Sequence, residues 1–214
     1  MTGVTYTIEV NQEHVSEALS LFEFLGGNTS DALRVAINRA APRVRTAASA
    51  AIRTQVRLKA AYVKDRLTLS KATRNKPTAR LSAASRGILL SRYSTDSNVS
   101  GNKVTWLKPP PLPKQGPRVK VKPDGKTAAV TGKSGEITGK PFYMVLKNSR
   151  ALAIVGRRLN AGNQGGKIKV FYAPSVSQVF NTVRDDVLPE ASNLLENEIL
   201  DAIRFLLAKK MPQE

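Results

Sequence analysis

Three residue patterns in this sequence are of types that can do chemistry: Gly-Lys pairs, one pair of adjacent aspartates and a single histidine. A Gly-Lys pair cradles phosphate only when another Gly stands five positions earlier, because backbone amides must wrap the phosphates, and a hydroxyl must follow to reach magnesium. The earlier position holds Lys, Thr or Ala in the pairs that begin at Gly125, Gly132 and Gly166. The sequence therefore predicts no nucleotide-binding loop and no cofactor.

The adjacent acids Asp185-Asp186 have two interpretations. Paired carboxylates can hold magnesium for a nuclease. They are also predicted to stand at the start of the last helix, where the helix dipole favours acids, and this structural interpretation is preferred. His14 is predicted to be a surface residue. The absence of Cys excludes disulfides and thiolate chemistry, and one His excludes a multi-histidine metal site. A non-enzymatic protein without a metal is expected.

Charge is the strongest compositional signal. The chain carries 34 Lys and Arg against 16 Asp and Glu, a formal charge of +18. Residues 1–33 hold five acids and no base, and 173–214 hold seven acids and four bases, whereas 34–87 hold fourteen bases and one acid and 88–172 sixteen bases and three acids. Such an excess favours a polyanionic partner, most simply nucleic acid. The acidic ends are predicted to meet basic surfaces of neighbouring copies.

Helical periodicity dominates both halves of the chain. Apolar residues recur at three and four from Ala32 to about Ala61, and Pro42 is expected to kink this helix or to begin a second one. A short helix over 14–25, a short helix or turn over 62–66, a helix over 175–183 with Ser175 as its cap, and a last helix over about 185–209 are also predicted.

Strand signals fall between these helices. Strands are expected over 4–10, 67–71, 78–84, 87–93 and 167–172, together with a hairpin of 142–148 and 151–159. Residues 94–136 are rich in Gly, Lys, Ser and Pro and include the polyproline run 109–117, so they are expected to form an extended loop or hairpin arm.

The expected fold is α+β: long N-terminal and C-terminal helices packed on a small, mostly antiparallel sheet, with the arm 94–136 inside a single domain of residues 1–214. No apolar run approaches the ~20 residues of a membrane span. The start of the chain has no basic and apolar leader, so no signal peptide and no membrane are expected, and the protein is expected to be made in the cytoplasm of the producing cell.

Four motifs lie within residues 36–81: Ala36-Ile37-Asn38-Arg39, Val63-Lys64-Asp65-Arg66, Lys71-Ala72-Thr73 and Pro77-Thr78-Ala79-Arg80. Together they resemble the minor tail protein Z family of tailed bacteriophages. The resemblance covers roughly 30–93 and 137–210, and it includes the 137–160 block with its LKN segment and the Leu-Pro-Glu opening of the terminal helix. No catalytic residue defines the family, so none is carried over.

The resemblance implies a virion protein at the head-proximal end of the tail, made in the host cytoplasm and acting in tail completion and head–tail joining. Neck proteins of this kind commonly form rings, so a hexamer or a dodecamer around the packaged double-stranded DNA is expected. Its expected neighbours are tail-terminator, tail-tube or head-connector proteins. A lumen lined by Lys and Arg would hold the duplex through phosphate contacts, without reading its sequence.

The predicted DNA-facing residues are bases at turns between elements: Lys64, Arg66, Lys71, Arg74, Lys76, Arg157 and Arg158. For each of them the alternative is a solvated charge or a contact with an acid of a neighbouring copy. Two other functions stay open at this point. A cellular nucleic-acid-binding protein would explain the charge equally well, and a magnesium nuclease would rest on Asp185-Asp186 alone.

Overall fold

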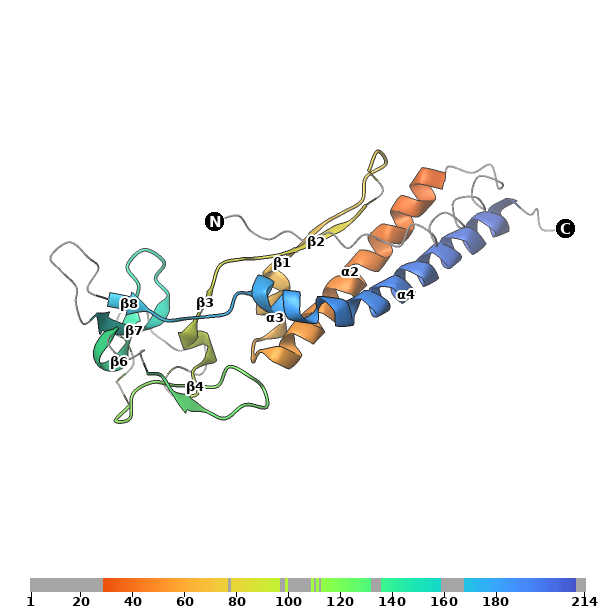
Figure 1. Cartoon of the computed structure of the whole chain (residues 1–214). Helices are drawn as coiled ribbons and strands as arrows, with labels where there is room; N and C mark the ends of the chain where they lie inside the picture. Colours follow the sequence, from red (N-terminus) through yellow and green to blue (C-terminus); the bar gives the residue numbers. More distant parts are fainter. Residues whose placement is uncertain are drawn as a thin grey trace. The chain divides into compact units, whose positions relative to one another are not determined.

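A computed structural model describes residues 29–76, 78–96, 99, 109, 111, 113–131, 136–158 and 168–210 (Figure 1). The strand predicted over 4–10 and the helix predicted over 14–25 lie outside these residues. The chain forms two compact units. Unit 1 contains residues 1–53, 59–85 and 176–214, and unit 2 contains residues 54–58 and 86–175. Whether they act together as the single domain expected over 1–214 stays a prediction.

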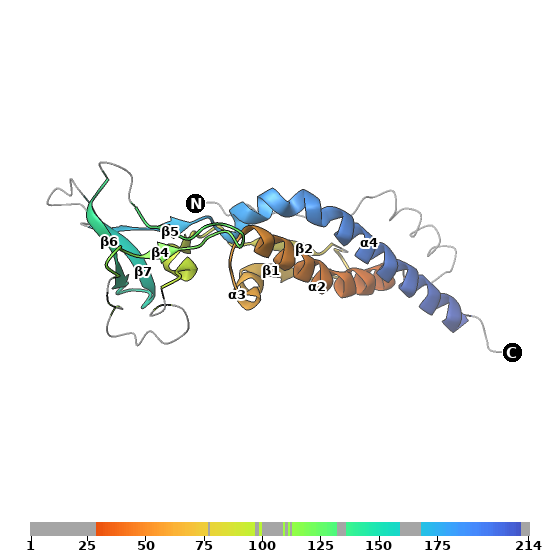
Figure 2. The same cartoon turned by 90° about the horizontal axis from the view of Figure 1, so that it is seen from below.

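Two long helices make up most of unit 1. Helix α2 (Thr29–Gln55) and helix α4 (Val176–Lys210) run antiparallel and side by side in both views (Figures 1 and 2). Their sequences repeat apolar residues at three and four, which gives each helix one stripe to bury. Each helix continues through an internal proline, Pro42 in α2 and Pro189 in α4. Both prolines are exposed, so their rings point away from the packed stripe.

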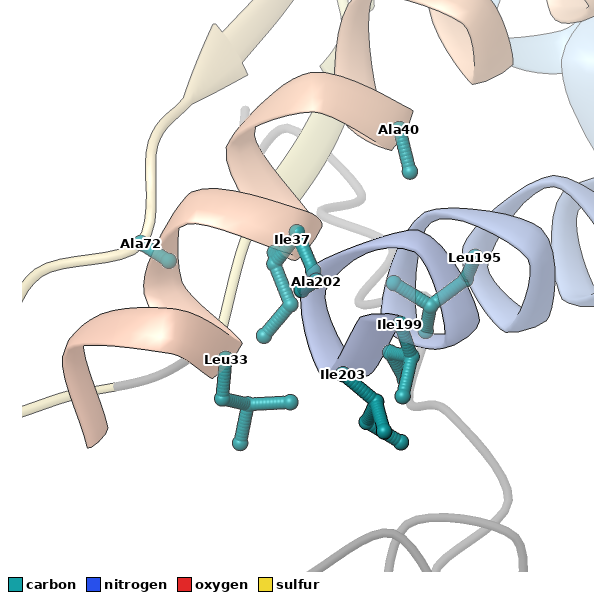
Figure 3. Close-up of a cluster of buried hydrophobic side chains, with 9 residues drawn as sticks. Leu33, Ile37, Ala40, Ala72, Leu195, Ile199, Ala202 and Ile203 are labelled. Atoms are coloured by element: carbon teal, nitrogen blue, oxygen red, sulfur yellow. The ribbon is translucent and has the colours of Figure 1, made fainter. Parts of the chain in front are cut away.

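The two stripes meet in a common hydrophobic core, and Figure 3 shows Leu33, Ile37, Leu195, Ile199 and Ile203 around it. Ala36 and Ala40 of α2 and Ala202 of α4 are also buried there. Alanine at these positions lets the helix backbones approach closely, because its side chain takes little space. Burial of this core is the main source of stability that the sequence supplies to unit 1.

A hairpin packs against the helices of unit 1. Helix α3 (Ala60–Asp65) leads into strand β1 (Leu67–Ser70), which pairs antiparallel with β2 (Arg80–Ala83) in the register Leu67–Ala83 to Ser70–Arg80. The side-chain amide of Asn38 on α2 donates to the Ala72 carbonyl at 3.0 Å, and its oxygen accepts from the Ala72 backbone N–H at 2.8 Å. The Asn38 side chain therefore bonds to the Ala72 backbone as a neighbouring strand would, and these two hydrogen bonds attach the hairpin to α2.

Unit 2 is built from short strands. The three-stranded antiparallel sheet runs in the order β6 (Ile137–Val145), β7 (Leu152–Arg158), β8 (Ile168–Val170). Two small pairs join β3 (Ile88–Leu89) with β9 (Tyr172–Ala173) and β4 (Arg118–Val119) with β5 (Ala128–Ala129). A 3-10 turn, η1 (Leu90–Tyr93), follows β3.

A buried polar network joins the start of the predicted arm to the sheet of unit 2. The Tyr143 hydroxyl donates to the Asp96 carboxylate at 2.6 Å, and Ser94 Oγ lies 2.8 Å from the Tyr143 oxygen. The backbone N–H of Arg118 donates to the same Asp96 oxygen at 3.3 Å. Burial first, and then the bond to Asp96, raise the pKa of Tyr143 above its ordinary value.

The α+β class is confirmed, as are the strands predicted over 67–71 and 78–84, which form β1 and β2, and the hairpin of β6 and β7. The described residues hold four small sheets, and of the strand predicted over 87–93 only Ile88–Leu89 is extended. Within the predicted arm, residues 113–131 carry β4 and β5, and the Lys120 N–H donates to the Tyr93 carbonyl at 2.9 Å. None of the described helices is long and apolar enough to cross a membrane.

Two helix predictions were wrong. The first helix ends at Gln55, and Ala60 starts a separate helix. The helix over 175–183 and the last helix are one helix, because the buried stripe continues without a break through Val179, Val183 and Val187. Asp185 and Asp186 therefore lie ten residues inside α4, and the explanation that placed them at the positive end of a helix dipole was also wrong.

Candidate nucleic-acid interface

Five of the seven predicted DNA-facing residues belong to unit 1, and two of these form part of its packing. The half-buried Lys64 lies in the last turn of α3, where its carbonyl accepts a hydrogen bond from the Arg45 guanidinium. The Arg66 guanidinium lies 5.2 Å from the centre of the Tyr62 ring, a cation–π contact. Both residues are basic, as a DNA contact requires, but each is only partly exposed.

Three more lie at the end of the β1–β2 hairpin. Thr73 and Lys76 exchange backbone hydrogen bonds of 2.9 and 3.2 Å, which closes the hairpin around Arg74 and Asn75. Arg74 is exposed but forms an ion pair with Asp31 of α2 at 3.2 Å. Lys71 and Lys76 are exposed and form no ion pair with any residue that the structure describes.

Arg157 and Arg158 lie in unit 2, at the end of β7, where both are exposed. Their places are set by pairing with Thr138 and Ile137 of β6. Gly156, the preceding residue, allows this approach, since a Cβ there would lie 2.8 Å from Ile137 Cγ2. The two arginines therefore project from a fixed strand end. The predicted bases at the hairpin and at the end of β7 therefore form two groups, one in each unit.

The fold divides the charge of the chain unequally between the units. Unit 1 combines the basic segment that follows residue 33 with both acidic ends, and over the full sequence it holds 16 bases and 13 acids. Unit 2 holds 18 bases and 3 acids. The net charges are therefore +3 and +15, and most of the excess positive charge of the protein belongs to unit 2.

Most of this charge faces solvent. Twelve bases in the described part of unit 2 are exposed, and ten of them were not among the predicted site residues: Arg57, Arg86, Arg92, Lys114, Arg118, Lys122, Lys126, Lys140, Lys147 and Arg150. The count of sixteen bases against three acids over 88–172 was the signal that could have found them. Residues 34–87 gave an equally strong count, which only the fold shows to be balanced by acids from distant parts of the chain.

Acids in unit 1 gather on α4. Glu198 is buried, and its carboxylate receives the Arg43 guanidinium of α2 at 2.8 Å. Asp186, Glu190 and Glu196 are exposed, and within the described part of the chain they form no ion pair. The outward side of α4 is therefore negative, in contrast to the hairpin end of the same unit.

The exposed bases of the described residues are groups that can bind phosphates. Asp185 forms an ion pair with the neighbouring Arg184 at 3.1 Å, and among the described residues no group of three His, Cys, Asp or Glu side chains could hold a metal ion. Exposed bases without a groove-reading element give contacts to the phosphate backbone, which carry no sequence information.

The sequence model of one protein family, described as prophage minor tail protein Z, matches residues 17–211. This match covers most of the chain. Searches of curated proteins and of solved structures found no significant match.

Proposed function

The chain belongs to the prophage minor tail protein Z family and is thus a structural component of a phage tail and of the virion; on this premise, we propose that it completes the tail at the head-proximal end and joins tail to head. In this proposal several copies, six or twelve, form a ring around the path of the packaged double-stranded DNA. Tail-terminator, tail-tube or head-connector proteins are the proposed neighbours.

The observation that carries the DNA part of the proposal is the charge of unit 2. A net charge of +15 on about 95 residues creates a potential that attracts a polyanion and that salt screens. A passing duplex must be held without being trapped at one sequence, and phosphate contacts from mobile surface bases meet that need. In this proposal unit 2 faces the DNA, with Arg157 and Arg158 among the contacts. A DNA-facing role for Lys64, Arg66, Lys71, Arg74 and Lys76 stays an untested prediction.

Electron microscopy of intact particles tests the location and the ring together. The protein is labelled with an antibody or a C-terminal tag that leaves infectivity unchanged. Label at the junction of tail and head, on density with six-fold or twelve-fold symmetry about the tail axis, is the expected result. Label elsewhere on the tail would contradict the head-proximal placement. Absence of label from particles, with free protein bound to cellular nucleic acid, would favour the nucleic-acid-binding protein that the charge alone also explains.

A further inference from the structure

We propose that the outward face of α4 in one copy binds the basic end of the β1–β2 hairpin in the next copy, and that this contact closes the ring. The inference rests on the proposed function, because it names the surfaces through which the ring would form. It assigns Lys71 and Lys76 to a contact with protein in place of a contact with DNA.

The α4 face carries acidic side chains that form no ion pair with the described residues. Asp186, Glu190 and Glu196 point within an arc of about 120° at 3.6 residues per turn, and the outermost two are about 15 Å apart along the axis. All three are exposed and form no ion pair with the described residues, whereas the fourth and fifth exposed acids of α4, Asp185 and Asp201, pair with arginines of their own helix. Three carboxylates on one face are thus available to a partner.

Unit 1 also carries a group of exposed basic side chains that complements these acids. Lys71, Lys76 and Arg80 lie within ten residues at the hairpin end, are exposed, and form no ion pair with the part of the chain that the structure describes. The hairpin is held in place by the Asn38 bonds to Ala72, so its bases are presented from a fixed backbone. Three bases against three acids on distinct elements suit a head-to-tail contact, which is the type that generates rings.

An exposed apolar residue also lies on the acidic side of α4. Leu200 falls within the same arc of α4, one turn beyond Glu196, and is 44% exposed. Large apolar side chains rimmed by charged residues are typical of protein contacts, where a desolvated centre strengthens the charge pairs around it.

Charge reversal tests this contact in the full-length protein. The acidic-face variant changes Asp186, Glu190 and Glu196 to Lys, and the hairpin variant changes Lys71, Lys76 and Arg80 to Glu. Each variant alone has like charges on both surfaces, so its self-association, measured by sedimentation velocity at low salt, is expected to weaken at least about tenfold. Circular dichroism and thermal melting first establish that both variants are folded.

Mixing the two variants is the decisive step. In an alternating ring every contact then joins opposite charges, so the mixture is expected to recover association in complexes with an even number of subunits, as six and twelve allow. A control variant with Lys114, Lys122 and Lys126 of unit 2 changed to Glu has the same charge change as the hairpin variant, and it should associate normally while binding duplex DNA more weakly.

Three results would overturn the contact: wild-type protein that stays monomeric at its highest soluble concentration, single variants that associate like wild type, or a mixture that fails to recover. Loss of association in the unit 2 control would also do so, since it would place the contact on the basic unit. The proposed function is tested separately, because label at the head-proximal end of the tail would stand even if the ring closed through other surfaces.

Discussion

Unit 1 and unit 2 use the same excess of basic residues in opposite ways. In unit 1, arginines of α2 and of the hairpin pair with acids from distant segments, as Arg43 does with Glu198 and Arg74 with Asp31. In unit 2, three acids face eighteen bases, and one of those acids, Asp96, is engaged by the Tyr143 hydroxyl. A count of basic residues along the sequence therefore does not show which surface binds a polyanion, because the fold decides which of these charges are neutralised by acids.

The units also differ in what holds them together, and the largest expected effect follows from this difference. Ile199 is buried in the core between α2 and α4 of unit 1, so Ile199→Ala should lower the free energy of unfolding by about 3 kcal/mol through lost burial and a residual cavity. Hydrogen exchange measured by mass spectrometry should speed up in α2 and α4 and stay unchanged in β6 and β7. Equal acceleration in both units would show that they unfold as one body. Ser192→Ala, at an exposed position of the same helix outside the proposed contact, is the control.

A second, smaller effect tests whether the charge balance of unit 1 is structural. Arg43→Met leaves the Glu198 carboxylate buried without its ion-pair partner and should cost about 2 kcal/mol, less than a fully buried pair because the arginine is itself exposed. Arg39→Met, one turn away at an exposed position, should change stability by less than about 0.5 kcal/mol. Adding Glu198→Gln to Arg43→Met should recover part of the loss in chemical denaturation. No recovery would mean that packing of the arginine stem, and not its charge, stabilises the helix pair.

Unit 2 should lose stability at high pH through the Tyr143 hydroxyl. The pKa of Tyr143 is raised in the folded state, so the folded protein keeps this proton at a pH where the unfolded chain has lost it. Stability from the bond is full below about pH 10 and should fall as the pH rises further, by about 1.4 kcal/mol per pH unit for one proton. Tyr143→Phe should cost about 1.5 kcal/mol near neutral pH and remove that slope. Tyr172→Phe, at an exposed position, should do neither. An unchanged slope in Tyr143→Phe would refute the assignment.

Local patterns predicted the elements well and their ends less well. The stripe from Leu33 to Ile52 and the strand signals over 67–71 and 78–84 depend on neighbours in sequence, and both were confirmed. The division of 175–209 into two helices was wrong because the valines 179, 183 and 187 are buried by tertiary packing. No sequence pattern indicated that Asn38 would bond to the backbone of Ala72, 34 residues away.

The candidate site was predicted by composition and only in part by position. A basic chain and its DNA partner could be proposed from counts, and Arg157 and Arg158 were identified at a strand end that the structure contains. The choice of five residues in unit 1 came from turns being exposed, which is correct for Lys71 and Lys76. What could not be predicted is which charges of unit 1 pair, because Arg43 and Glu198 are more than a hundred residues apart and meet only after folding.

The salt dependence of DNA binding tests the central claim, that DNA binds to unit 2, most directly. Binding of a short duplex is measured from low to moderate salt, at protein concentrations too low for self-association, for Arg157→Ala/Arg158→Ala and for the matched unit 1 variant Lys71→Ala/Lys76→Ala. The unit 2 variant should lower the slope of log affinity against log salt by about two, as expected for two lost phosphate contacts, and the unit 1 variant should leave the slope unchanged. A lowered slope for the unit 1 variant alone would contradict the account and place the DNA on the hairpin.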